Sequence, residues 1–372
     1  MKQNTGTSPD VIASLDGIRA VAIGLVFLAH GGLSDIVPGG LGVTLFFVLS
    51  GYLITTLMRV EFADTGSLDL PAFYLRRLLR LMPPLLVVLL LALLLHWTGL
   101  VQTAPTPAGV ASVIFYYGNY FAIFHQFKGM PDGLGITWSL AVEEHFYIVF
   151  PVLALLLLRF RRAASVIPLV VLCAAILAWR CWLVAHGASE DRIYMATDTR
   201  IDAILTGCVM ALLCNPVLDP VPSRARKYTW VICVTALGVL VGTLLYRNEY
   251  FRETYRYTIQ SLAVAPLIYL AVVQSRIPAF RWLNAGPVVY LGKISYTVYL
   301  AHQACLFFIS EHWPRLGEVA TMVATALLVL AIAVPMRRWV EIPFARIRKR
   351  LHQRRQAKAP KVGAMAQVKA DR

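Results

Sequence analysis

Two ionisable side chains, Arg19 and His30, interrupt the first long apolar segment of the sequence, residues 15–30. They are 11 residues apart, which on an α-helix leaves them about 20° apart around the axis and about 16 Å apart along it. Ionisable groups inside an apolar span are costly and usually face the interior of a helix bundle. We therefore expect both residues to share one helix face and to belong to a reaction centre. The alternatives are an end anchor for Arg19 and a structural polar contact for His30.

A second basic group lies in the stretch LRRLLRLMPP, residues 75–84. Arg77 and Arg80 are three residues apart and are therefore neighbours on a helix face. Guanidinium groups match phosphate oxygens in a two-pronged geometry. We interpret these two arginines as a clamp for the phosphates of a cytoplasmic donor, and the alternative is ordinary positive-inside signalling.

Two carboxylates and a histidine, Glu143, Glu144 and His145, open the apolar stretch ITWSLAVEEHFYIVFP, residues 136–151. The dipole at a helix N-terminus favours negative charge by about 0.3–1 kcal/mol, which accounts for one of the carboxylates. We expect Glu143 to orient His30 or to hold an acceptor, with Glu144 as the less favoured candidate for that role.

Further polar side chains lie in TDTRID, residues 197–202, and in KISYTVYLAH, residues 293–302. A local ion-pair network is the alternative for the first stretch, and a structural histidine is the alternative for the second. The candidates for substrate binding or for support of the site are Asp16, Trp138, Glu144, Asp198, Arg200, Asp202, Tyr299 and His302.

The elements that must position these residues are membrane helices. Of the 372 residues, 58% are hydrophobic and 15% are charged, whereas a soluble domain has roughly 45–50% and about 25%. Apolar runs recur from residue 15 to residue 335, and one span takes about 20 residues. We predict an all-α bundle of about ten transmembrane helices. Residues 1–14 would form an N-terminal segment, 15–344 the membrane domain and 345–372 a basic, partly disordered tail.

The sequence contains eleven apolar segments, one more than this prediction. If 108–124 does not cross, the loops hold twelve Lys and Arg on one side and six on the other, and such an excess marks the cytoplasmic side. We therefore expect 108–124 to be a re-entrant or interfacial helix on the outer side, with both termini cytoplasmic in a bacterial cytoplasmic (inner) membrane.

The net charge of +15 comes mostly from the C-terminal end, where residues 337–372 hold 12 Lys and Arg against Glu341 and Asp371, a net +10. Basic clusters next to a span favour anionic lipids of the cytoplasmic leaflet. We expect membrane lipids as partners and no nucleic acid. The six cysteines contain no C-x-x-C pair, so we expect neither a metal site nor a permanently bound cofactor.

Six motifs, taken in order, resemble the bacterial integral-membrane acyltransferase-3 family. They are LDGIRAVAI…AH, GGLGVTLFFVLSGYLI, FYLRRLLRLMPP, TWSLAVEEHFY, DTRIDAIL and LGKISYTVYLAH. The resemblance covers about Leu15 to Phe344. The R-x10-H pattern of the family falls on Arg19 and His30, its R-x-x-R pattern on Arg77 and Arg80, and its W-x4-E pattern on Trp138 and Glu143. Many members have Gln where this chain has His145.

This resemblance implies transfer of an acyl group, most often acetyl, from cytoplasmic acyl-CoA to a hydroxyl of an extracytoplasmic or lipid-linked carbohydrate. The phosphates of acyl-CoA would bind Arg19, Arg77 and Arg80. His30 would act as general base or take the acyl group itself. The alternative is a transporter or flippase of a glycan or lipid intermediate, in which buried charges couple proton or substrate movement.

Overall fold

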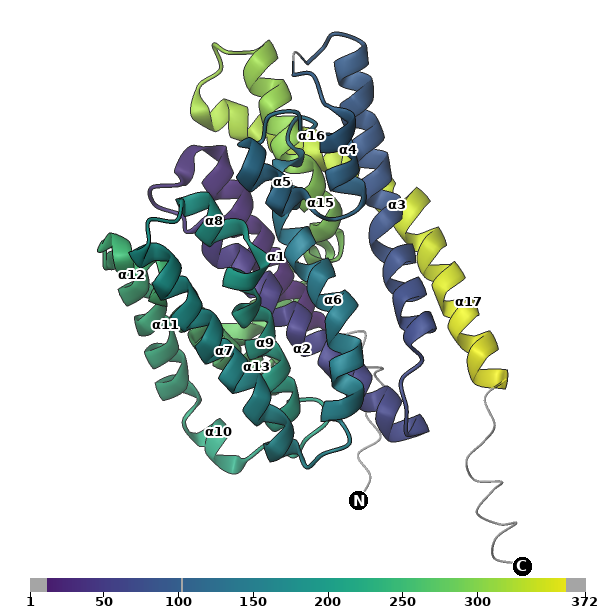
Figure 1. Cartoon of the computed structure of the whole chain (residues 1–372), viewed down its shortest axis with the longest axis vertical. Coiled ribbons are helices and arrows are strands. Elements are labelled where there is room, and N and C mark those ends of the chain that lie inside the picture. Colours follow the sequence, from purple (N-terminus) through teal and green to yellow (C-terminus); the bar gives the residue numbers. More distant parts are fainter. Residues whose placement is uncertain (1–11, 102, 359–372) are drawn as a thin grey trace, which may run out of the picture.

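The chain folds into one bundle of long helices with short helices at its two ends (Figure 1). This computed structural model describes residues 12–101 and 103–358, and these residues form no strand. The α-helices are α1 (Ala13–Leu28), α2 (Gly39–Thr65), α3 (Leu70–Trp97), α4 (Pro107–Ile114), α5 (Gly118–His125), α6 (Trp138–Leu157), α7 (Arg162–Ala185), α8 (Glu190–Met195), α9 (Thr197–Leu213), α10 (Ser223–Lys227), α11 (Thr229–Leu245), α12 (Glu249–Glu253), α13 (Tyr255–Val273), α14 (Pro278–Arg281), α15 (Gly286–His312), α16 (Glu318–Met336) and α17 (Ile342–Lys358). The π-helical turns are η1 (Ala29–Leu33) and η4 (Arg337–Glu341), and the 3₁₀ turns are η2 (Leu134–Thr137) and η3 (Trp282–Asn284).

Seven of the described helices are long and apolar enough to cross a membrane, some of them continued by a π or 3₁₀ turn. They are built on α1, α2, α3, α6, α7, α13 and α16. The other predicted spans coincide with α9 and α11, which have 17 residues each, and with α15, which carries Lys293 and His302 along its 27 residues. The predicted all-α membrane bundle is confirmed, whereas length and composition do not confirm the predicted count of ten spans.

The apolar segment 108–124 forms two short helices rather than one. α4 and α5 have 8 residues each, about 12 Å at 1.5 Å per residue, which is too short to cross the hydrocarbon core. The chain turns between them at Tyr116, whose φ of 55° is left-handed. Both helices lie at the upper end in Figure 1, near the turn that joins α15 to α16. This arrangement agrees with the prediction that the segment does not span. The prediction of a single helix was wrong, because the chain breaks into two helices at Tyr116.

Helices α1 and α15, which carry His30 and His302, approach each other closely at one end. A Cβ added to Gly292 of α15 would lie 1.8 Å from the carbonyl oxygen of Asp16 in α1. Only glycine permits this approach, as is common where membrane helices pack through small residues. The contact sets the two helices against each other about four turns before His30 on the first helix and about three turns before His302 on α15.

The segment predicted to be a basic tail begins as a helix. The chain continues from α16 through the π turn η4 into α17, which ends at Lys358. Residues 345–358 are therefore helical. Residues 359–372, for which the predicted partial disorder of the tail stays a prediction, lie outside the described residues, as do residues 1–11.

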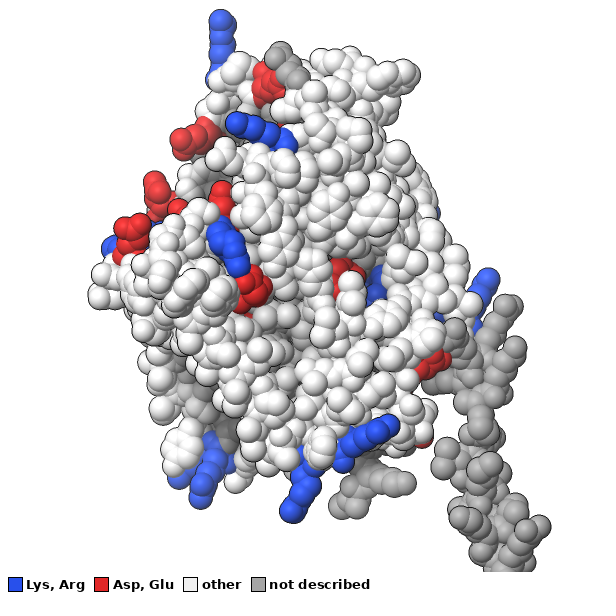
Figure 2. All heavy atoms as spheres, in the orientation of Figure 1, with Lys and Arg blue, Asp and Glu red and all other residues white. Residues whose placement is uncertain are grey.

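Charged side chains gather towards the two ends of the molecule. Figure 2 shows basic side chains at the lower end near α10, most of the acidic side chains together with a few basic ones in the upper half, and a largely uncharged surface between them. The exposed apolar residues include Leu90 of α3, Ile167 of α7 and Val231 of α11, each at least 63% exposed. A wide exposed apolar surface of this kind suits lipid.

The acidic side chain of Asp219 links three elements at the basic end. Its carboxylate accepts hydrogen bonds from Arg59 of α2 at 2.8 Å and from Arg162 of α7 at 2.7 Å. Burial alone would raise the pKa of Asp219, but the hydrogen bonds from Arg59 and the Asn215 backbone, with the charges of Arg59 and Arg162, hold that pKa below its usual value. Part of the positive charge at this end is thus neutralised within the fold.

Candidate functional site

The helix that carries Arg19 and His30 changes its winding at the histidine. α1 is α-helical to Leu28, and the next five residues form the π turn η1, in which Gly32 has a φ of 105°. π turns inside helices occur frequently at functional sites. His30 is exposed at this turn, so its imidazole lies at the end of the apolar α1 helix rather than within it.

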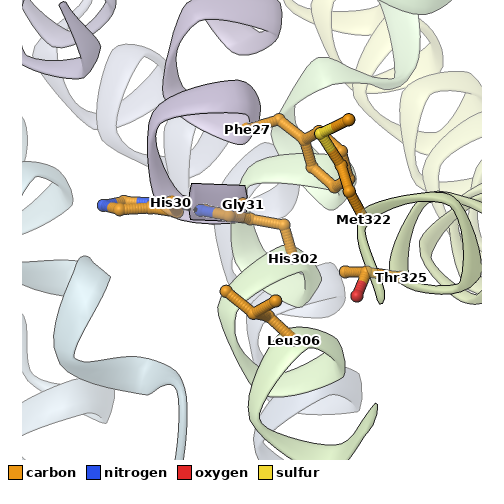
Figure 3. A pocket seen from close by; sticks show the side chains of 7 residues that line it. All are labelled: Phe27, His30, Gly31, His302, Leu306, Met322 and Thr325. Atoms are coloured by element: carbon orange, nitrogen blue, oxygen red, sulfur yellow. Dashed lines mark hydrogen bonds between the residues drawn. The ribbon is translucent and has the colours of Figure 1, made fainter. Parts of the chain in front are cut away.

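His30 contacts a second histidine, His302 of α15. The Nδ1 atom of His30 lies 2.8 Å from the Nε2 atom of His302. The two rings are nearly coplanar, at 13°, with centroids 5.1 Å apart. Figure 3 shows them end to end beside Gly31, above a pocket that Leu306, Met322 and Thr325 also line. Sequence analysis selected both histidines but did not predict that they would be hydrogen-bonded to each other.

The partner histidine is itself held from the other side. His302 is 1% exposed, and its Nδ1 lies 2.6 Å from the carbonyl oxygen of Tyr299. The Tyr299 hydroxyl lies 2.7 Å from the Ser139 hydroxyl and donates to the carbonyl oxygen of Ile136 at 3.0 Å. Tyr299 therefore contacts the start of α6 through its hydroxyl and His302 through its backbone carbonyl.

The three predicted donor-binding arginines belong to one electrostatic cluster. Arg19 of α1 forms an ion pair with Asp16 at 2.7 Å and interacts with the charge of Arg80 on α3. Arg77 lies over the ring of Tyr147, with the guanidinium carbon 4.2 Å from the ring centroid, and also interacts with Arg80. Like charges gathered in this way repel one another, and the Asp16 carboxylate already offsets part of that repulsion.

The two glutamates of α6 lie on the same cluster. The Tyr147 hydroxyl donates to Glu143 at 3.0 Å, and both Glu143 and Glu144 interact electrostatically with Arg77. Among the described residues, Glu144 Oε1 is buried without a hydrogen-bond partner. Figure 2 shows an acidic and a basic side chain together in a hollow between α6 and α3. The expected contact of Glu143 with His30 stays a prediction, since Glu143 contacts Tyr147 and His30 contacts His302.

Trp138 and Arg200 contact each other within a group of aromatic rings. The guanidinium carbon of Arg200, a fully buried residue, lies 4.1 Å from the Tyr257 ring centroid, 5.0 Å from that of Tyr194 and 5.8 Å from that of Trp138. Arg200 Nη1 donates to the carbonyl oxygen of Tyr194 at 3.3 Å. Cation–π contacts of this kind stabilise a buried charge where no carboxylate is paired with it.

The remaining polar residues of the TDTRID stretch form the local networks that were the alternative interpretation. Asp202 accepts from Arg180 at 2.9 Å and from Thr258 at 2.6 Å, and both charged side chains are at most 1% exposed. Asp198 forms a more exposed ion pair with Arg192 at 2.9 Å and accepts from the Trp179 indole. Asp202 thus joins α7, α9 and α13.

His145, whose role the sequence left open, contacts the start of α9. Its Nδ1 lies 2.7 Å from the Thr197 hydroxyl, and its ring stacks near Tyr120 of α5. It faces neither the arginine cluster nor His30 in these contacts. Tyr147, by contrast, was missed by the sequence analysis, although it lies four residues after Glu143 and so on the same helix face.

The chain matches a family of known proteins over most of its length. Residues 12–338 match a family described as an acyltransferase domain, Acyl_transf_3. The chain belongs to the acyltransferase-3 family. The family predicted from the six motifs is thereby confirmed.

Two curated relatives show how the acyltransferase-3 chain compares with longer proteins. It is 31% identical over 356 residues to the O-acetyltransferase OatA of Staphylococcus aureus, covering 91% of this chain and 58% of the relative. It is 29% identical over 318 residues to the peptidoglycan O-acetyltransferase OatA of Listeria monocytogenes, covering 81% and 50%. The chain thus spans about half the length of these relatives. No solved structure matches it.

Proposed function

We propose that this acyltransferase-3 chain moves an acetyl group from acetyl-CoA on the cytoplasmic side of the membrane to a hydroxyl of a carbohydrate on the outer side. One observation carries the proposal. The three arginines gather around one end of the α1 face, and His30 is exposed 11 residues farther along the same helix. Phosphate-binding and proton-accepting groups are then separated by about 16 Å along the axis.

The donor would bind through the arginine cluster. Acyl-CoA carries several phosphate charges on its nucleotide part, and Arg19, Arg77 and Arg80 supply three guanidinium groups that match phosphate oxygens. The thioester lies at the far end of a long flexible arm, so it could reach His30 while the phosphates stay at the arginines. In this proposal acetyl-CoA is a substrate, and the reaction uses no permanently bound cofactor.

The transfer step would use His30 as a general base. Its imidazole accepts the proton of the acceptor hydroxyl while that oxygen attacks the thioester carbonyl carbon. The new ester C–O bond forms, the C–S bond breaks, and the CoA thiolate leaves with the proton that His30 returns. The alternative is a route of two acyl transfers. The His30 nitrogen attacks the thioester carbon and displaces the CoA thiolate; the acceptor hydroxyl then attacks the acetyl-imidazole, the C–N bond breaks, and the hydroxyl proton passes to the CoA thiolate.

The acceptor class follows from the relatives. One of them is called a peptidoglycan O-acetyltransferase, and we extend that acceptor, a cell-wall glycan, to this chain. Membrane orientation supports the same choice, because the basic end near α10 favours the cytoplasmic side and the His30 end then faces outward. Lipid-linked precursors of such glycans would meet His30 at the same end.

The test is transfer of labelled acetyl from acetyl-CoA to soluble peptidoglycan fragments by the purified chain. His30→Ala should lower kcat at least about a hundredfold, the lower range of general-base catalysis. Arg77→Ala should raise KM for acetyl-CoA about tenfold or more, because a charge-assisted hydrogen bond is worth about 1.5–3 kcal/mol. Full activity in His30→Ala would contradict the proposal.

Arg76→Ala is the matched control for Arg77→Ala. Arg76 is the neighbouring residue on α3, but its guanidinium forms an ion pair with Glu61 at 3.1 Å. Its removal changes the charge of α3 by the same amount without removing a member of the cluster. We expect KM for acetyl-CoA to be nearly unchanged in this control; an equal rise in both variants would indicate a general effect of charge.

A further inference from the structure

We infer that His302 is a positioning residue, which holds the His30 imidazole in the tautomer that presents an unprotonated Nε2 atom to the reactants. This inference rests on the proposed function, in which His30 is the base. It assigns to α15 the orienting role that the sequence led us to expect from Glu143 on α6.

The contact between His302 and the Tyr299 carbonyl determines which ring nitrogens of the two histidines carry a hydrogen. A backbone carbonyl can only accept, so the Nδ1 atom of His302, 2.6 Å from the Tyr299 carbonyl oxygen, carries a hydrogen. His302 is 1% exposed, and a buried charge without an anionic partner is costly. In the neutral ring, Nε2 of His302 is then an acceptor. The hydrogen between the two rings must belong to His30 Nδ1, which leaves Nε2 of His30 without one.

The ring geometry favours this hydrogen bond over a stacking contact. Two stacked rings cannot bring ring atoms to 2.8 Å, which is within the range of a hydrogen bond, whereas His30 and His302 meet at that distance. At 13° between planes and 5.1 Å between centroids, the rings meet edge to edge. The lone pair of one nitrogen, which lies in its ring plane, therefore points along the N–H bond of the other. Figure 3 shows the two rings end to end.

His302 is itself fixed by its surroundings. Its Nδ1 atom donates to the carbonyl oxygen of Tyr299 at 2.6 Å, and its ring lies near the rings of Tyr299 and Phe27, with centroids 5.6 Å and 6.4 Å away. On the pocket side, Leu306, Met322 and Thr325 line the space beside the two histidines, and the Thr325 hydroxyl has no hydrogen-bond partner among the described residues. A side chain held on both sides loses little rotational freedom when it orients its neighbour.

The consequence for catalysis is direct. Once Nε2 of His30 accepts the hydroxyl proton, the imidazole is positively charged, and its Nδ1–H donates to the His302 lone pair in a charge-assisted hydrogen bond. In the opposite tautomer Nε2 would carry a hydrogen and could not accept that proton. A wrong histidine tautomer costs a protease triad about 10⁴ in kcat, so loss of the partner should affect kcat rather than donor binding.

The test compares two substitutions at His302 in the full-length chain, with acetyl-CoA as donor and soluble peptidoglycan fragments as acceptor. His302→Leu removes the acceptor, and we expect kcat to fall at least about a hundredfold with KM for acetyl-CoA unchanged. His302→Gln supplies a side-chain carbonyl in place of Nε2 and should restore kcat to within about tenfold of the wild type. Two results would overturn the inference and leave the proposed function intact. One is an equal loss of kcat in His302→Leu and His302→Gln. The other is an unchanged kcat in His302→Leu while His30→Ala is inactive.

Two further measurements separate positioning from stability. Thr325→Val is the matched control, because Thr325 lines the same pocket, is 2% exposed, and its hydroxyl has no hydrogen-bond partner among the described residues; its kcat should match the wild type. ¹⁵N NMR of histidine-labelled protein should report the Nδ1–H tautomer for His30 in the wild type and its loss in His302→Leu. An Nε2–H tautomer of His30 in the wild type overturns the inference even without an activity assay.

Discussion

At the scale of single residues, Tyr147 joins the parts of the site that the sequence treats separately. Its ring lies under Arg77, a candidate for donor binding, and its hydroxyl donates to Glu143, a candidate for catalysis. One side chain thus makes two contacts of different kinds, one through the ring face and one through the oxygen. Substitutions can remove them one at a time.

Tyr147→Phe keeps the ring and removes the hydroxyl, so we expect KM for acetyl-CoA to stay near the wild-type value. Tyr147→Leu also removes the cation–π contact with Arg77, worth about 0.5–2 kcal/mol, and should raise that KM by about 2- to 30-fold. Steady-state kinetics of the two variants with acetyl-CoA measures the difference. The same KM in both variants would mean that the ring does not support Arg77.

At the scale of elements, the two ion pairs of the stretch 197–202 are expected to contribute very differently to stability. Asp202 ties α9 to Arg180 of α7 and to Thr258 of α13 in the interior, whereas Asp198 pairs with Arg192 in a partly exposed position. Breaking a buried pair leaves an uncompensated charge and costs about 3–5 kcal/mol. An exposed pair contributes about 0–1 kcal/mol.

We therefore expect Asp202→Ala to lower the thermal stability of the detergent-solubilised protein strongly and Asp198→Ala to change it little. Thermal unfolding of both variants, followed by intrinsic fluorescence, gives the comparison. The protein that remains folded in Asp202→Ala should keep the wild-type KM for acetyl-CoA, since Asp202 lies in a structural network. A large KM change with normal stability would instead assign Asp202 to substrate binding.

At the scale of the whole molecule, the proposed reaction needs the two ends to face different compartments. α10 lies at the lower, basic end and α8 lies towards the upper end in Figure 1. The positive-inside rule assigns the α10 end to the cytoplasm. Donor access and acceptor access would then come from opposite sides of the bundle.

This orientation is testable with a matched pair of exposed serines, Ser223 at the start of α10 and Ser189 just before α8. In a background whose six cysteines are replaced by alanine, a membrane-impermeant maleimide should label Ser189→Cys in intact cells. Ser223→Cys should react only after the membrane is opened. Labelling of Ser223→Cys in intact cells would reverse the orientation and exclude a cytoplasmic donor at the arginine cluster.

The sequence by itself determined the apolar helical class and the family, and it supplied the candidate residues for the site. It could do so because apolar length, the spacing of Arg19 and His30 and the R-x-x-R pattern are local properties of the chain. The charge count also predicted that 108–124 would not span, and the two short helices α4 and α5 agree with that prediction. The break at Tyr116 was not predicted, because apolar length carries no information about a local backbone turn.

Only the tertiary structure decided which of these residues contact each other. His30 and His302 are 272 positions apart, and no helical periodicity relates α1 to α15. Their hydrogen bond depends on how the two helices cross, with Gly292 against the Asp16 backbone at one end and the π turn at His30 at the other. For the same reason the sequence could select Glu143 and His302 as candidates but could not tell which of them would hold His30.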